Sequence, residues 1–218
     1  MASRNKKSVD AISGKIGRHV HYEMFGNQVV RSMPRKTTKP TTPDRKINQS
    51  KFTKTQVVMQ AMIPFIRVGF SGYTDDHSAY HEAMSVNLQQ NIFSSSETGE
   101  ADYSQVILSR GELPGAEQVE AQRIDQNKIQ LTWSTAPGSS VSPTDQVMLL
   151  FYCPAKNISF ILLDAASRGD DTVTVELPAY LANEGLEAFI SFVNSNRMMI
   201  GDKKHGISDS RYAGRLEG

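Results

Sequence analysis

The sequence predicts an α+β protein with three parts: an N-terminal β-hairpin arm, a helical hairpin and a C-terminal immunoglobulin- or fibronectin-like antiparallel β-sandwich. Two β-rich runs flank a Gly-Asn turn near the start, apolar residues recur at helical spacing in the middle, and seven β-rich runs follow. The expected bounds are residues 1–42 for a basic arm with the hairpin, 43–94 for the helical hairpin, 101–200 for the sandwich and 201–218 for a polar tail.

The arm is predicted from two runs, GRHVHY and NQVVRS, which flank the turn residues Gly26 and Asn27. Side chains alternate along a strand, so Val20 and Tyr22 would share one face of the first strand, opposite its two histidines. A two-stranded hairpin is marginally stable in water. We therefore expect this hairpin to lie on its own domain, a neighbouring subunit or a nucleic acid.

The helical part begins at a clear start signal. Residues 42–44 place a capping threonine, a proline and an acidic residue in the order that begins a helix. Pro64 would kink or break this first helix before a short continuation, FIRVGF. A second helix is expected from residue 75 or 76 to about residue 91, where apolar residues again recur at helical spacing.

The sandwich is predicted from seven short runs with turn residues between them. TVTVEL alternates as a half-buried strand should, whereas QVMLLFY is almost continuously apolar and would be central. Trp133 would lie in the core between the two sheets. The runs are YSQVILSR, EQVEAQ, KIQLTWS, QVMLLFY, ISFILLD, TVTVELP and LEAFISFVN.

Charge is divided unequally along the chain. Residues 1–54 contain thirteen Lys and Arg against three acidic residues, whereas residues 55–218 contain eleven against twenty. The formal net charge of +1 therefore conceals a basic end and an acidic remainder. Such a division suggests that the two ends meet different surroundings.

The basic arm is the feature that points to a function. A positively charged arm can neutralise nucleic-acid phosphates, or it can dock on an acidic protein surface such as the rest of this chain. Aromatic residues are sparse in the arm, which favours protein contact over base stacking. The residues expected to make the contact are Lys6, Lys7, Lys15, Arg18, Val20, Tyr22, Val29, Val30, Arg31, Arg35, Lys36 and Lys39.

No arrangement of residues predicts an enzyme, a cofactor or a metal site. His77 and His81 are four residues apart on a predicted helix, but HSAYHE lacks the HExxH order and an identifiable third ligand, so a polar helix face is favoured. Cys153 is the only cysteine, which excludes an internal disulfide, and it is expected to be a small buried residue. We expect a protein without catalytic residues.

No apolar run follows the basic residues at positions 4–7, so we expect no Sec-type secretion signal, and no apolar run approaches the length of about 18 residues that spans a membrane. We expect synthesis in the cytoplasm without membrane insertion. A phage product would then leave the cell in a virion.

Several motifs resemble a known family. SGKIG, VVRSMP, PFIRVGF, VILSRGELPGAE and QLTWS with TDQVMLLFY resemble an uncharacterised Bacteroidetes family, a domain of unknown function. The resemblance covers most of residues 12–200, and SRGELPGA and FIRVGF are its most specific pieces. The family has no established activity, so the resemblance implies no catalytic residues. The N-terminal pattern is also similar to that of phage structural proteins.

These observations predict a non-enzymatic structural protein, a component of a phage particle (head, connector or tail). Its basic arm would contact neighbouring protein subunits in a homo-oligomer or a multiprotein assembly. The alternative is a nucleic-acid-binding accessory protein that uses the same arm. The partner of the arm, the symmetry of the assembly and a host ligand for the sandwich stay open.

Overall fold

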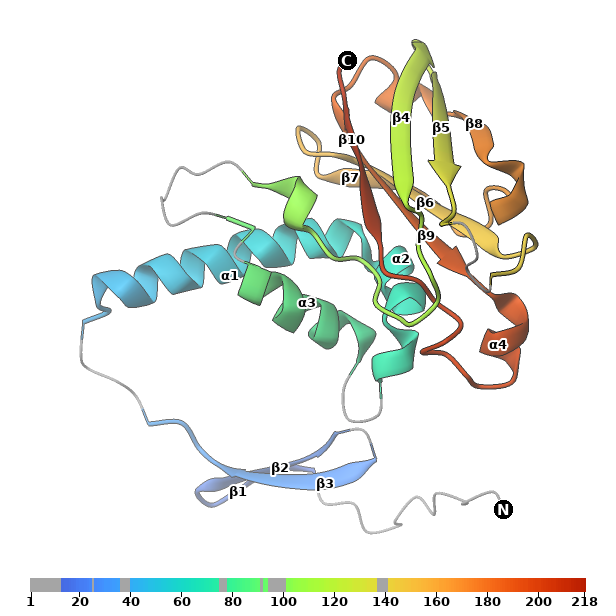
Figure 1. Ribbon diagram of the computed structural model, residues 1–218. Helices are drawn as coiled ribbons and strands as arrows, with labels where there is room; N and C mark the ends of the chain where they lie inside the picture. Colours follow the sequence, from blue (N-terminus) through green and yellow to red (C-terminus); the bar gives the residue numbers. More distant parts are fainter. Residues whose placement is uncertain are drawn as a thin grey trace. The chain divides into compact units, whose positions relative to one another are not determined.

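A computed structural model gives the fold of residues 13–24, 26–35, 40–74, 78–90, 92–93, 101–136 and 141–218. The chain divides into two compact units, residues 1–42 and residues 43–218, which are called the arm unit and the body below. Both contain antiparallel strands, and the body also contains the helices (Figure 1). The fold class is therefore α+β, as predicted.

The arm unit contains a three-stranded sheet where a two-stranded hairpin was expected. The predicted hairpin is present, with Gly26 in its turn at a φ of 78°. An additional strand pairs with it because Gly17 adopts a positive φ of 58°, which lets the chain reverse just before the hairpin. The strands run in the order β1 (Gly14–Ile16), β2 (His19–Met24) and β3 (Asn27–Ser32).

The helices of the body begin and end near the predicted positions. The first begins at Pro43, and the chain breaks from it at Met62 because Pro64 lies in the first turn of the next helix, where its missing N–H costs no hydrogen bond. The second predicted helix begins later than expected, although residues 75–77 lie outside the described residues. The helices are α1 (Pro43–Ala61), α2 (Ile63–Gly69), α3 (Ala79–Gln90) and α4 (Ser195–Met199).

The strands of the body form an immunoglobulin- or fibronectin-like β-sandwich, which confirms the predicted architecture. One sheet has the order β4-β5-β8 and the other the order β10-β9-β6-β7, all antiparallel. The strands are β4 (Gln118–Asp125), β5 (Lys128–Ser134), β6 (Gln146–Cys153), β7 (Ile158–Leu162), β8 (Thr172–Glu176), β9 (Leu186–Val193) and β10 (Arg211–Leu216).

Two predictions about the edges of the sandwich were wrong: one predicted strand is absent from both sheets, and one strand was not predicted. The run YSQVILSR forms the short 3₁₀ helix η2 (Tyr103–Gln105) and an extended segment outside both sheets. Residues 201–218 are not a polar tail, because they supply β10, in which Ala213 and Leu216 are buried. The sequence concealed this strand because a β-bulge at Gly214 shifts the alternation of inward and outward side chains.

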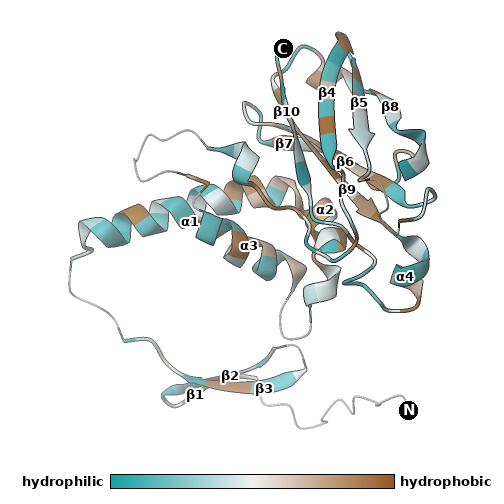
Figure 2. Cartoon of the chain, in the orientation of Figure 1, coloured by the Kyte–Doolittle hydropathy of each residue, from teal (hydrophilic) through white to brown (hydrophobic). Residues whose placement is uncertain are grey.

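The sheet β10-β9-β6-β7 packs against a separate core on each of its two faces. Alternate residues of β6 enter two different cores: Leu149 and Phe151 pack between the sheets, whereas Met148 and Leu150 pack against α1, α2 and α3. This explains why the β6 sequence is continuously apolar. Figure 1 shows the helices beside the sandwich, and Figure 2 shows the hydrophobic colouring of β9 inside the body. Residues 43–94 and 101–218 are therefore one unit and not separate parts.

The two most family-specific motifs meet in the body. The Arg110 N–H donates to the Gly69 carbonyl at 3.0 Å, which joins SRGELPG to FIRVGF. The Glu112 N–H donates to the Lys204 carbonyl at 2.7 Å, and the Leu113 N–H donates to the Ile207 carbonyl at 3.0 Å. SRGELPG is thus bonded both to FIRVGF and to the segment between α4 and β10, and these three backbone hydrogen bonds, called the clasp below, give the motifs a structural role.

No helix among the described residues is long and apolar enough to cross a bilayer.

Candidate functional site

The residues considered for metal binding or catalysis are placed as follows. His77 lies outside the described residues, and His81 Nδ1 is 2.9 Å from Ser78 Oγ. Cys153 is a free thiol and is buried at the end of β6, as predicted. Within the described ranges, no group of three or more His, Cys, Asp or Glu side chains is placed to hold a metal. The basic arm is therefore the candidate site carried forward from the sequence.

One face of the arm sheet combines basic, aromatic and apolar side chains. The register places Lys15 opposite Val20 and Val20 opposite Arg31, with Tyr22 opposite Val29 on the same face. The Arg31 guanidinium carbon lies 5.8 Å from the centroid of the Tyr22 ring, within the range of a cation–π contact. This basic-aromatic face contains five of the twelve residues predicted from the sequence.

The remaining predicted residues are placed elsewhere. Val30 lies on the opposite face with the two histidines of β2, so the twelve residues do not form one surface. Arg18 is in the turn between β1 and β2, and Arg35 follows β3; both are exposed. The residues outside the described ranges are Lys6, Lys7, Lys36 and Lys39.

The described residues of the arm sheet form no core of their own. No described residue between positions 13 and 35 is buried, and Ile16 and Val30 keep 51% and 55% of their surface exposed. Val20, Tyr22 and Val29 are partly covered by their neighbours in the sheet. Apolar side chains are therefore available on both faces of this sheet.

The strand β3 is an edge of the arm sheet, and its outward hydrogen-bonding groups can be identified. The Met33 N–H donates to the Arg18 carbonyl at 2.8 Å, which fixes the alternation of the antiparallel ladder. By that alternation, the peptide groups of Gln28, Val30 and Ser32 point away from β2. Within the described residues, no strand pairs with this edge.

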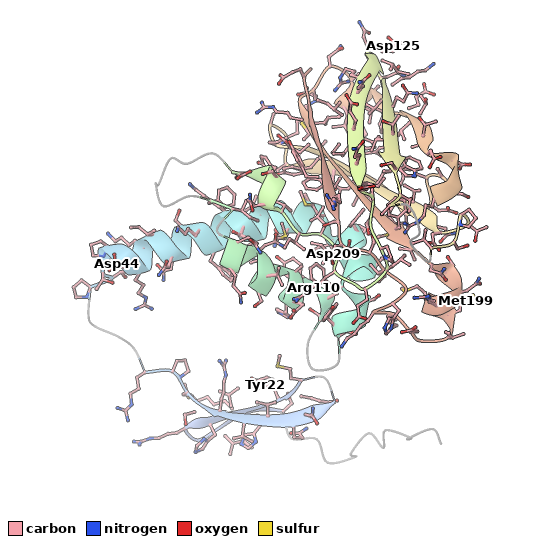
Figure 3. All side chains as sticks on the ribbon, in the orientation of Figure 1. Tyr22, Asp44, Arg110, Asp125, Met199 and Asp209 are labelled. Carbon is pink, nitrogen blue, oxygen red and sulfur yellow. The ribbon has the colours of Figure 1, made fainter. Side chains whose placement is uncertain are left out.

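The two units differ in net charge. The arm unit contains nine Lys and Arg against two acidic residues, whereas the body contains fifteen against twenty-one. Figure 3 shows Tyr22 on the arm sheet, and Asp125 and Asp209 on the body. The arm unit is therefore net basic and the body is net acidic.

Comparison with known proteins places this chain in a family. Residues 11–205 match a family of unknown function, DUF6266. The chain belongs to this family. Both FIRVGF and SRGELPGA lie inside the matched range, which confirms the prediction that the chain resembles a domain of unknown function. No curated protein matches the chain.

Solved structures are similar to about half of the chain. The FN1–FN3 domains of chicken CNTN1 match with 12% identity and a TM-score of 0.32, over 50% of this chain and 31% of that chain. Titin kinase and its flanking domains match with 13% identity and a TM-score of 0.30, over 50% and 17%. The fn3 domain of the human collagen alpha-1(XX) chain matches with 18% identity and a TM-score of 0.29, over 48% and 84%.

The sequence prediction missed one polar site in the body. Glu187 lies in β9 and is almost fully buried, with a hydrogen bond from the Tyr212 hydroxyl at 2.5 Å. The signal was present in the sequence, because a charged residue interrupts the otherwise apolar run LEAFISFV. A buried charge in such a run requires a partner or a function.

Proposed function

We propose that this protein is a non-enzymatic structural component of an assembly, in which the arm sheet of one copy docks on the body of a neighbouring copy. The docking uses β-strand addition at the open edge of β3. The assembly we propose is a phage particle. The support for that finer statement is the similarity of the N-terminal sequence pattern to phage structural proteins.

The observation that carries the proposal is a sheet that exposes both an unpaired edge and apolar side chains on each face. Ordering each residue costs about 1–2 kcal/mol of backbone entropy, and a small sheet without a core recovers little of it alone. A partner strand beside β3 would satisfy the outward peptide groups, and a partner surface would cover Val20, Tyr22 and Val29.

A second copy is the partner that the charges favour. The arm unit is basic and the body is acidic, so contact between copies brings opposite charges together. Contact between two arm units would bring like charges together. The proposed contact is therefore heterologous, arm to body, and such contacts generate rings or open arrays.

Proline at one edge position tests this proposal. Val30→Pro removes the outward N–H of β3 but leaves the bonds between β2 and β3 in place, because proline is tolerated where the N–H of an edge strand faces solvent. Val30→Thr is the matched control, since it keeps both the N–H and a β-branched side chain. Light scattering during size-exclusion chromatography should show an oligomer for the natural chain and for Val30→Thr, and a monomer for Val30→Pro.

Two results would refute strand addition. The first is a natural chain that stays monomeric at every concentration tested. The second is a Val30→Pro variant that assembles as well as the natural chain.

Nucleic-acid binding is the second candidate, and the basic-aromatic face favours it. Lys15 and Arg31 share that face with Tyr22, so phosphate contact and stacking are available together. Fluorescence anisotropy with a labelled oligonucleotide should then show a log–log salt slope of about −0.9 per phosphate contact. Lys15→Gln and Arg31→Gln should each reduce that slope by about 1. Absence of binding at low salt removes this candidate.

A further inference from the structure

A pocket in the body opens over one end of β9 and β10 and holds about 420 Å³. This volume is in the range of small-molecule sites. Its lining includes Asp102 and Tyr103 from the start of η2, Glu187 from β9, and Tyr212 and Arg215 from β10. Segments far apart in the sequence therefore contribute charged and aromatic groups to one concave surface.

Glu187 presents one carboxylate oxygen to this pocket from a side chain that is otherwise buried. The residue keeps only 3% of its surface exposed. The Tyr212 hydroxyl donates to Oε2, whereas the nearest charged group to Oε1 is Arg215 Nε at 4.0 Å, beyond hydrogen-bond distance. Among the described residues, no donor bonds to Oε1. Oε1 is not among the buried polar atoms that lack a partner, so it is accessible to a ligand that can donate a hydrogen bond.

A β-bulge in β10 builds this arrangement. Tyr212 lies opposite Phe189, and Arg215 lies opposite Glu187, although Tyr212 and Arg215 are three positions apart. In a regular strand they would point to opposite faces, but the additional residue of the bulge returns both to the face of Glu187. Gly214 permits the bulge with a φ of 117°. Bulges that redirect side chains in this way are frequent beside functional sites.

The other lining groups favour a positively charged ligand. Asp102 is a second carboxylate, and its Oδ1 accepts bonds from the Ser104 N–H at 3.1 Å and the Ser104 hydroxyl at 2.6 Å. Tyr103 and Tyr212 supply aromatic rings, whose faces attract cations. Arg215 is the single basic residue of the lining; its side chain is 62% exposed and also lies 3.6 Å from Glu217 Oε1, so it can leave Glu187 without losing its charge partner.

We propose that this pocket binds an organic cation, an ammonium or guanidinium group that donates to Glu187 Oε1 and lies against the tyrosine rings. The cation has two sources with the same chemistry. It is either a free amine or guanidine compound, or a lysine or arginine side chain from the arm unit of another copy. The second source rests on the proposed function, and the first does not.

The site can be tested on the full chain by NMR titration. The probes are N-acetyl-arginine amide and N-acetyl-lysine amide, and N-acetyl-citrulline amide is the neutral control with nearly the shape of arginine. A cationic probe should shift the amide resonances of residues 102–104, 187 and 212–215. The neutral probe, and a monosaccharide, should shift them little.

Two variants distinguish a loss of cation binding from a loss of folding. Glu187→Gln keeps the shape and an acceptor for Tyr212 but removes the charge, so cation affinity should fall about tenfold or more. Arg215→Gln removes the competing cation at an exposed position, so affinity should rise. If Glu187→Gln fails to fold, Arg215→Gln still decides the proposal, because unchanged or weaker binding in that variant refutes it.

The remaining outcomes are also decisive. Shifts outside the pocket, equal binding of the citrulline probe or no shift with either cation overturns the proposal. If Glu187→Gln loses probe binding but still assembles, the source is a free cation. If it loses both, the source is the arm of another copy. Val30→Pro leaves the pocket intact, so loss of assembly in that variant with normal probe binding tests the arm separately.

Discussion

The molecule contains two three-stranded antiparallel sheets with different surroundings. In the sheet β4-β5-β8, alternate side chains of β5 enter a core, and Ile129, Leu131 and Trp133 are buried. In the sheet β1-β2-β3, no described side chain is buried. Both sheets follow the same pairing rules, so the comparison shows that alternation and turns define a sheet, whereas a second layer makes it part of a stable core.

The largest difference is expected when the aromatic residue of each sheet is removed. Trp133 is 4% exposed and its indole N–H donates to the Arg168 carbonyl at 2.8 Å, so Trp133→Ala should lower the free energy of unfolding by about 3–5 kcal/mol. Tyr22→Ala should change it by less than about 0.5 kcal/mol. Urea unfolding followed by far-UV circular dichroism measures both. Equal losses would mean that the arm sheet is packed on the body.

The next largest difference is expected between the two glycines of the motif SRGELPGA. A Cβ at Gly111 would overlap the carbonyl of Ile207 in the clasp, whereas a Cβ at Gly115 would meet only Asp209 O at 3.7 Å. Gly111→Ala should therefore destabilise the body by about 1–3 kcal/mol, and Gly115→Ala by much less. Thermal unfolding of the two variants decides this. If Gly111→Ala does not lower the melting temperature, the close approach of Gly111 to Ile207 is not kept in solution.

Alkaline pH should affect the body through a buried tyrosine. Burial raises the pKa of Tyr152 above its ordinary value of 10.0, and Tyr103 raises it further. The folded state thus favours the neutral phenol, so stability is lost as pH rises above about 10. Tyr152→Phe should cost about 1 kcal/mol at neutral pH, because the hydroxyl donates to Asn157 Oδ1 at 2.9 Å.

The same variant separates the contribution of Tyr152 at high pH. Urea unfolding at pH 8 and pH 11 should show a smaller alkaline loss in Tyr152→Phe than in the natural chain. Part of the loss should remain, since burial and Glu187 also raise the pKa of Tyr212. An identical loss in both proteins would contradict the role given to Tyr152.

The smallest effect on the body is expected from cutting the arm. Trypsin should cleave the free monomer after Arg31 or Arg35, which are exposed, and leave a folded body. Arg123 should be spared, because its guanidinium donates to the carbonyls of Gln126, Glu184 and Glu217 at 2.6–2.8 Å. Mass spectrometry of the products identifies the sites. Assembly of the natural chain should protect Arg31.

Local sequence patterns accounted for most elements of the body. The start of α1 at Pro43, the strands from β4 to β9 and the buried position of Trp133 all followed from signals within a few residues. Two of the failures share a cause. The turn at Gly17, which adds β1 to the hairpin, and the bulge beside Gly214, which conceals β10, both depend on a glycine with a positive φ. A positive φ is a property of the folded backbone that composition shows only as glycine.

The charge of the sequence identified the arm as the candidate site, but it did not predict how the basic and apolar side chains are arranged on the two faces of the arm sheet. The sequence determined which residues are basic, which side chains alternate and that a sandwich follows two helices. Only the tertiary structure decided that the helices cover the sheet β10-β9-β6-β7 and that Glu187 meets Tyr212 in a pocket. Alternation and capping act between near neighbours in the chain, whereas burial in a core depends on segments that are far apart in the sequence.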